Sequence, residues 1–171
     1  MQHEGELEMT SMADTMTLTA EPGGLTLRLT REFDASRELV FRAMLDRDSI
    51  PRWWGPSRYT TVVEAMDVRV GGTWRFRQSD AEGNVYVFSG EYREIVAPER
   101  VVQTFEFDGA PGEVSVETTT LEERGGRTLM TVVSAFSSVE ARDGMVAGGM
   151  ENGVRETYTR LDAVLASMAG S

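Results

Sequence analysis

The side chains available for chemistry in this chain are carboxylates, tyrosines and arginines. The 171-residue sequence contains no Cys, all 17 of its basic residues are Arg, and its single His is His3 in a polar stretch. These absences exclude thiol nucleophiles, disulfides, thiolate metal sites and Schiff-base lysines, and they leave no His suited to acid-base catalysis or metal binding. We therefore predict no metal site and no cofactor, and we assign no catalytic residue.

Charged residues gather before a glycine pair. Glu64, Asp67 and Arg69 precede Gly71 and Gly72. Facing inward, such a carboxylate and guanidinium would orient the polar end of a ligand or a substrate carbonyl. The simpler alternative is an ion pair between Asp67 and Arg69, or hydrogen bonds to the turn backbone. No second carboxylate has a spacing that predicts an acid-base pair, and the glycine pair lacks the helix and third Gly of a nucleotide-binding loop.

Two adjacent tryptophans provide the strongest indication of a binding site. Trp53 and Trp54 lie between Arg52 and a Gly-Pro break at residues 55–56. Two neighbouring indoles on one short element cannot both point into one packed core, so at least one is expected to line a groove, a cavity or an interface. The pair predicts a hollow ligand-binding domain.

Aromatic residues also alternate with polar ones along the expected strands, so that one face of the sheet is aromatic and the other is exposed to solvent. Together with the Trp pair, the charged pair and the methionines near Gly148 and Gly149, they make up the candidate ligand-binding residues: Trp53, Trp54, Asp67, Arg69, Trp74, Phe76, Tyr86, Phe88, Phe105, Phe136, Met145, Met150 and Tyr158. The alternative for each single ring is ordinary core packing.

The elements that must position these residues are mostly short strands. The length fits one domain; we expect a disordered acidic leader over residues 1–16 and one domain over residues 17–168. Residues 17–20 and 25–33 predict a hairpin, followed by a helix capped by Ser36 and a short helix over residues 48–54. Further strands are predicted at residues 59–68, 73–78, 85–96, 100–107, 113–122 and 127–136. Their short connections favour an antiparallel meander.

A long C-terminal helix is expected to follow. Ser137 and Glu140 suggest a capping box, and an apolar face continues to Met168. Gly148, Gly149 and Gly153 would weaken or kink the first half of this helix. A curved sheet meeting one helix has more concave surface than the helix covers, so we expect a pocket between them.

Net charge and hydropathy limit the classes of binding partner that we expect. The formal net charge is −11, which disfavours nucleic acid and anionic membranes. The sequence has neither an apolar run of about 20 residues nor a basic and hydrophobic N-terminal signal. We expect a cytoplasmic protein with no nucleic-acid or membrane partner, and a homodimer is left open.

Ordered motifs resemble a known family. They lie at residues 33–36, 40–41, 52–56, 67–72, 90, 98–101 and 149–153, with Leu161 after them. This series resembles the domain of the activator of heat-shock protein 90 ATPase homologues, within the START-like (SRPBCC) helix-grip superfamily that also holds polyketide cyclases. The resemblance covers residues 25–168 and implies an α+β fold: a curved antiparallel sheet around a long C-terminal helix, two short helices after the first long strand, and a hydrophobic cavity. The eukaryotic co-chaperones of this family carry a further N-terminal domain, for which the leader here is too short, so ATPase activation is not expected.

Three functions remain in competition. The favoured one is a non-enzymatic protein that binds a small hydrophobic, aromatic or lipid-like ligand in the cavity. The second is a polyketide cyclase or dehydratase-like enzyme, which a perturbed carboxylate deep in the pocket would favour. The third is a chaperone-associated interaction module, which would place the Trp pair on an exposed patch.

Overall fold

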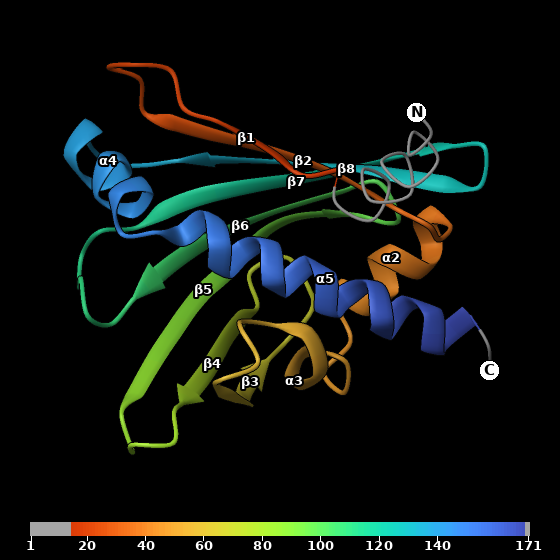
Figure 1. The fold of residues 1–171 in the computed structure, drawn as a ribbon, viewed down its shortest axis with the longest axis horizontal. Coiled ribbons are helices and arrows are strands. Elements are labelled where there is room, and N and C mark those ends of the chain that lie inside the picture. The colour runs from red at the N-terminus through yellow and green to blue at the C-terminus, as the bar shows by residue number, and fades with distance from the viewer. Residues whose placement is uncertain (1–14, 170–171) are drawn as a thin grey trace, which may run out of the picture.

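The computed structural model describes residues 15–169, which form one antiparallel sheet with helices across one of its faces (Figure 1). The strands are β1 (Thr17–Thr19), β2 (Thr26–Phe33), β3 (Thr60–Met66), β4 (Thr73–Ser79), β5 (Val85–Val96), β6 (Arg100–Phe107), β7 (Ser115–Arg124) and β8 (Arg127–Ala135). The helices are α2 (Arg37–Met44), α3 (Ile50–Trp53), α4 (Val139–Ala147) and α5 (Met150–Ala169). The predicted α+β class, with a curved sheet and a long C-terminal helix, is confirmed.

The sheet has the strand order β1-β2-β8-β7-β6-β5-β4-β3, and all neighbours are antiparallel. The predicted meander is therefore correct from β3 to β8. It is incomplete at β2, which pairs with β8 at the other end of the meander, so that Phe33 lies opposite Thr128. Helices α2 and α3 lie in the connection between β2 and β3, which carries the chain to the far edge of the sheet.

Two irregularities bend the sheet. The register shifts between Val63 and Ala65 on β3, and again between Tyr92 and Glu94 on β5. A bulge of this kind bends its strand and increases the local twist. Both shifts lie in the half of the sheet formed by β3 to β5, which curves toward the helices (Figure 1).

The N-terminal hairpin is present as predicted, with Thr17 paired to Thr30. Residues 1–14 of the expected leader lie outside the described residues. Its last two residues belong to the domain: Met16 is buried in the core, and the Thr15 hydroxyl accepts a hydrogen bond of 2.9 Å from the Glu32 amide. Packing therefore starts slightly before the predicted boundary at residue 17.

Helix α2 begins as expected, because the Ser36 hydroxyl accepts a hydrogen bond from the Leu39 amide. Helix α3 is shorter than the predicted span of 48–54. It starts at Ile50, with Pro51 in its first turn, where a missing amide hydrogen has no consequence for the helix. Gly55, at a φ of 86°, then turns the chain away.

The span predicted as one C-terminal helix is divided in two at the glycines that were expected to weaken or kink it. The chain forms α4 and α5, which are separated by Gly148 and by Gly149 at a φ of 82°. The glycine pair breaks the helix because a left-handed residue cannot continue a right-handed helix. The cap was also misplaced by one residue: Ser138, not Ser137, accepts the hydrogen bond from Ala141. Within residues 15–169, no helix is both long enough and apolar enough to cross a membrane.

Helix α5 packs tightly through its C-terminal half. Leu161, Val164 and Leu165 are buried there against α2, α3 and the sheet. The Asp162 carboxylate accepts two hydrogen bonds from Arg31 of β2, at 2.9 and 2.7 Å. The Arg31 side chain is only 2% exposed, and its guanidinium lies 4.8 Å from the centre of the Phe33 ring. This ion pair links α5 to strand β2.

Removing the Asp162 carboxylate should destabilise the fold more than removing an exposed one. Asp162→Ala leaves a buried guanidinium without its main counter-charge, so we expect unfolding to become easier by about 2 kcal/mol. Chemical denaturation measures this difference. As a control, Glu122→Gln breaks the exposed pair with Arg124 and should change stability much less, because water screens an exposed ion pair. Equal effects of the two substitutions would contradict the anchoring role of Arg31.

Candidate ligand-binding site

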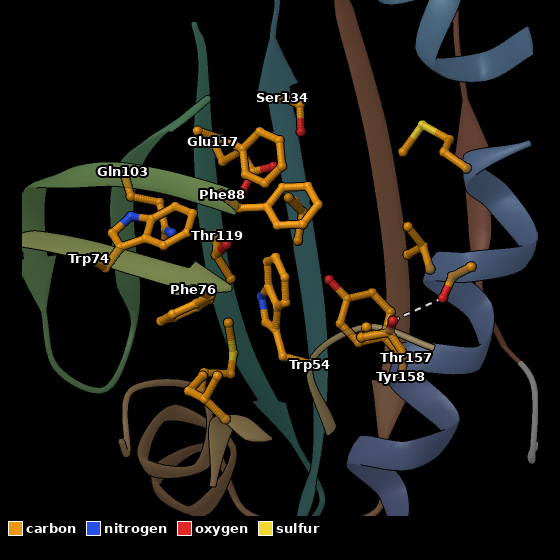
Figure 2. A pocket seen from close by; sticks show the side chains of 18 of the residues that line it. Trp54, Trp74, Phe76, Phe88, Gln103, Glu117, Thr119, Ser134, Thr157 and Tyr158 are labelled. Carbon is orange, nitrogen blue, oxygen red and sulfur yellow. Dashed lines mark hydrogen bonds between the residues drawn. The ribbon is translucent and has the colours of Figure 1, made fainter. Parts of the chain in front are cut away.

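A cavity of about 340 Å³ lies between the sheet and the N-terminal half of α5 (Figure 2). Its volume is at the lower end of the range typical of small-molecule sites. Strands β4 to β8 supply one wall, and α3 with the turn after it supplies a second. The third wall comes from α4 and from the first turns of α5, including Val154 and Tyr158. The space lies beside the first turns of α5, whereas the fully buried residues of this helix begin at Leu161.

The two adjacent tryptophans both line this cavity, but in different ways. Trp53 is 5% exposed, and its indole nitrogen donates a hydrogen bond of 3.2 Å to the Ala43 carbonyl. Its ring stacks on Tyr158 at a centroid distance of 6.5 Å. Trp53 is thus mainly a core residue with one edge on the cavity.

Trp54 is the centre of an aromatic cluster. Its ring contacts Trp74, Phe76 and Phe88 edge to face, at centroid distances of 6.4, 5.0 and 5.2 Å. Its backbone carbonyl accepts hydrogen bonds from Thr61 and Gln78, which hold the turn in place. Edge-to-face contacts of this kind add stability beyond burial alone. The wall is therefore preformed.

Gly90 allows Trp74 to reach its place in this wall. A Cβ atom at position 90 would lie 1.9 Å from the Thr104 carbonyl oxygen and 2.6 Å from the Trp74 indole nitrogen. Any side chain there would collide with backbone as well as ring. The indole nitrogen is buried without a hydrogen-bond partner among the described residues.

The structure brings most of the predicted site residues together. The candidates on the cavity wall are Trp53, Trp54, Trp74, Phe76, Phe88, Phe105, Phe136, Met145, Met150 and Tyr158. Tyr86 lies instead in an adjoining, more polar depression of about 590 Å³. This depression shares Gln78, Phe88, Met150 and Gly153 with the cavity. It reaches Gly148 and Gly149 at the break between α4 and α5.

Asp67 and Arg69 do not line the cavity. They form an ion pair of 2.8 Å on the turn before β4, where both side chains are more than half exposed. The Asp67 carbonyl also lies so close to Gly72 that a Cβ atom there would be 2.0 Å from it. This geometry matches the simpler alternative of a turn ion pair, and it removes the pair as a means of orienting a ligand in the cavity.

The polar residues that line the cavity from β6, β7 and β8 were not predicted from the sequence. They lie in a row across the middle of the sheet, with Gln103 on β6, Ser115, Glu117 and Thr119 on β7, and Ser134 on β8. The sequence Ser-Val-Glu-Thr-Thr resembles a solvated strand face. The available signal was Leu121: it is buried and has the same strand parity as Glu117, so Glu117 must point to the same side of the sheet.

Glu117 is the unusual member of this row. Its cross-strand neighbours are Gln103 and Ser134, both neutral. Burial raises the pKa of its carboxyl group from 4.5 to about 7, since no cation lies beside it to stabilise the charged form. The side chain is half-buried and lines the cavity. A carboxyl group of this kind can exchange a proton near neutral pH.

Two tyrosines share the cavity wall with Glu117. Burial raises the pKa of Tyr158, and the nearby Glu117 carboxylate raises it further. Burial also raises the pKa of Tyr92 to about 12. Both hydroxyl groups are therefore neutral at physiological pH and can donate hydrogen bonds into the cavity. No cluster of three or more potential metal ligands occurs in the part of the chain that the structure describes.

A curved antiparallel sheet that holds a long C-terminal helix over an aromatic cavity defines a helix-grip fold. The family model of the Activator of Hsp90 ATPase homolog 1-like proteins matches residues 34–166, and the chain belongs to this family. A comparison of the chain with curated proteins found no match.

Solved structures of bacterial proteins are similar over most of the chain. A solution structure from Arthrobacter aurescens is 29% identical with a TM-score of 0.81, and covers 88% of this chain and 91% of its own. A crystal structure from Chromobacterium violaceum is 28% identical with a TM-score of 0.74, and covers 82% and 96% respectively. One from Rhodobacter sphaeroides has a TM-score of 0.82 at 24% identity, covers 89% and 98%, and supports the fold alone.

The raised pKa of Glu117 predicts that this residue lowers the folding stability in a pH-dependent way. The Glu117 carboxyl group stays protonated to a higher pH in the folded protein than in the unfolded chain. Its contribution to folding stability is therefore fully present below about pH 4.5 and is lost as the pH rises through about 7. Glu117→Gln should therefore gain stability over the native protein between pH 4.5 and pH 8, by at most about 3 kcal/mol. Denaturant unfolding at both pH values measures this gain. Glu122→Gln should show no such change, and a flat difference for Glu117→Gln would exclude the raised pKa.

Proposed function

We propose that this protein binds a small, largely apolar molecule, aromatic or lipid-like, in the cavity between the sheet and α5. The observation that carries the proposal is a preformed space of about 340 Å³ walled mainly by aromatic and aliphatic side chains. Each 100 Å² of apolar ligand surface buried there would contribute about 2.5 kcal/mol, before the cost of immobilising the ligand. The candidate contacts are the aromatic residues on the wall, with the polar row on β6 to β8 setting orientation.

Intrinsic fluorescence offers a direct assay. All three tryptophans of the chain, Trp53, Trp54 and Trp74, line the cavity, so a bound ligand should alter their emission. A screen of lipids, aromatic compounds and polyketides tests for binding. Native mass spectrometry of the purified protein tests for a ligand that co-purifies with it. No emission change, no thermal stabilisation and no carried ligand would reject the proposal.

Filling the cavity should abolish binding. Val154 faces the cavity from α5, so Val154→Trp places an indole in the ligand space and should weaken any ligand found in the screen by more than about 10-fold. Calorimetric titration measures the loss. Thr159→Trp adds the same ring to an exposed position on the same helix and should leave binding unchanged. Equal binding by both variants would place the ligand elsewhere.

The buried carboxyl group favours a second candidate function, an enzyme acting on a bound carbonyl compound of the polyketide type. Glu117, with a pKa near 7, could remove a proton next to a carbonyl group and return it to a leaving hydroxyl. If this is the activity, Glu117→Gln should bind the same ligand with similar affinity but show at least about 100-fold slower conversion. Mass spectrometry of ligands incubated with both proteins distinguishes the two functions, because a binding protein returns them unchanged.

The Trp pair does not support an interaction module. Such a module would expose the two indoles on a surface patch, whereas Trp53 is buried and Trp54 packs among Trp74, Phe76 and Phe88. The aromatic residues singled out by the sequence therefore favour a ligand inside the domain over a partner protein on its surface.

A further inference from the structure

Glu117 is the one charged residue on the cavity wall that residues 15–169 form. The rest of the wall is apolar, aromatic or neutral and polar, and it contains no Arg. The chain as a whole holds 17 Arg residues, so basic side chains are plentiful, but they lie elsewhere. The cavity therefore carries one negative charge when Glu117 is ionised and none when it is protonated.

The Glu117 carboxylate has no protein partner within the described residues. Its cross-strand neighbours, Gln103 and Ser134, make no hydrogen bond to it, and neither does Tyr158, which faces the same space (Figure 2). Buried carboxylates are ordinarily paired or hydrogen-bonded, because an unmatched charge in a low-dielectric site is costly. The missing donor can be supplied by whatever occupies the cavity.

The charge on the wall discriminates between ligands. A fatty acid or another anionic ligand would place its carboxylate near Glu117 without a basic residue to compensate, which is repulsive in a low-dielectric site. Arg31 does not provide that compensation, since its guanidinium is held by Asp162 and lies over Phe33. An ammonium group would instead find a counter-charge in Glu117.

The rings of the wall favour the same ligand chemistry. Trp54, Trp74, Phe88 and Phe105 form a connected set, with neighbouring ring centroids 5.2 to 6.4 Å apart. The electron-rich faces of aromatic rings attract organic cations. A carboxylate at the end of an aromatic pocket therefore matches both ends of an amine that has an apolar body.

We propose that the ligand of this cavity is a small, largely apolar amine, whose ammonium group pairs with the Glu117 carboxylate while its apolar body lies among the rings. This inference rests on the proposed binding function and names the ligand class for it. The neutral row formed by Gln103 and Ser134 accepts the remaining hydrogen bonds of the ammonium group.

The protonation state of Glu117 links this recognition to pH. In the empty cavity burial holds the pKa of Glu117 near 7, and a bound ammonium group would lower it by stabilising the charged form. The other titratable groups facing this space are Tyr92 on β5 and Tyr158 on α5. Both have a raised pKa and stay neutral across the range used here. Strands β6 and β8 contribute only the neutral Gln103 and Ser134 beside Glu117.

Three matched probes test the inference on the full chain: naphthylethylamine, naphthylethanol and naphthylpropanoate, which share one apolar body and differ in the charge of the head group. Calorimetric titration at pH 8 should show the amine binding at least about 10-fold more tightly than the alcohol, with the carboxylate weakest. Glu117→Gln should remove the preference for the amine and leave the alcohol unchanged. Glu122→Gln, which changes the same charge on the exposed part of β7, should behave like the native protein.

The pH dependence provides a second readout. Below about pH 7 an ammonium ion must displace the Glu117 proton, so the affinity for the amine should fall by about 10-fold for each further pH unit. The affinity for the alcohol should not fall in this way. In Glu117→Gln the dependence should disappear for the amine as well.

The outcomes separate the two proposals. If the alcohol binds as tightly as the amine, or if Glu117→Gln keeps the amine preference, the amine inference is wrong while the binding function stands. Tighter binding of the carboxylate would also overturn it. If none of the three probes binds to a protein whose unfolding transition is intact, the cavity does not take ligands of this size and both proposals fail.

Discussion

Helix α5 has fully buried side chains only in its C-terminal half, and the cavity depends on this constraint. Its C-terminal half is held by Leu161, Val164 and Leu165 and by the pairing of Asp162 with Arg31. Its N-terminal half begins at the break after Gly149 and lines the cavity through Val154 and Tyr158, of which Tyr158 also packs on Trp53. Interiors are normally packed to the density of organic crystals, so an apolar space of this size inside a small domain needs rigid walls around it. The bent sheet and the cluster around Trp54 are those walls.

In the proposed binding function, the aromatic wall and the polar row would have different roles. Rings from β4, β5, β6 and the turn after α3 supply apolar area, which gives affinity but little selectivity. The row that runs from Gln103 through Glu117 to Ser134 supplies the few polar contacts that can fix the orientation and the charge of a ligand. The row lies on three adjacent strands of the sheet and lines the cavity, where a charge is screened less than in bulk water.

Glu117 connects the two candidate functions. A carboxyl group that is buried and lacks a counter-charge has a pKa near neutrality for physical reasons alone, whether or not the protein is an enzyme. As a binding group it would discriminate between ligands by their charge, and as a catalytic group it would transfer a proton. The family to which the chain belongs fixes the helix-grip scaffold, while the identity of the polar groups inside it determines which chemistry the scaffold can support.

Local signals in the sequence were enough for most elements. Alternation along the strands located β5 and β6 to the residue, Ser36 marked the start of α2, and the adjacent Trp53 and Trp54 indicated a cavity. The sequence indicated weakening or a kink at Gly148, Gly149 and Gly153 but did not predict a complete break, because glycines weaken a helix without showing which residue adopts a left-handed conformation. It also favoured Asp67 and Arg69 over Glu117 as polar cavity groups. Charge alone does not tell which face of a strand is buried, and that is settled only when β7 pairs with β6 and β8 beneath α5. Residue types and their periods thus determined the fold class and the aromatic lining, whereas strand pairing and helix packing decided which carboxylate loses contact with water and so acquires its chemistry.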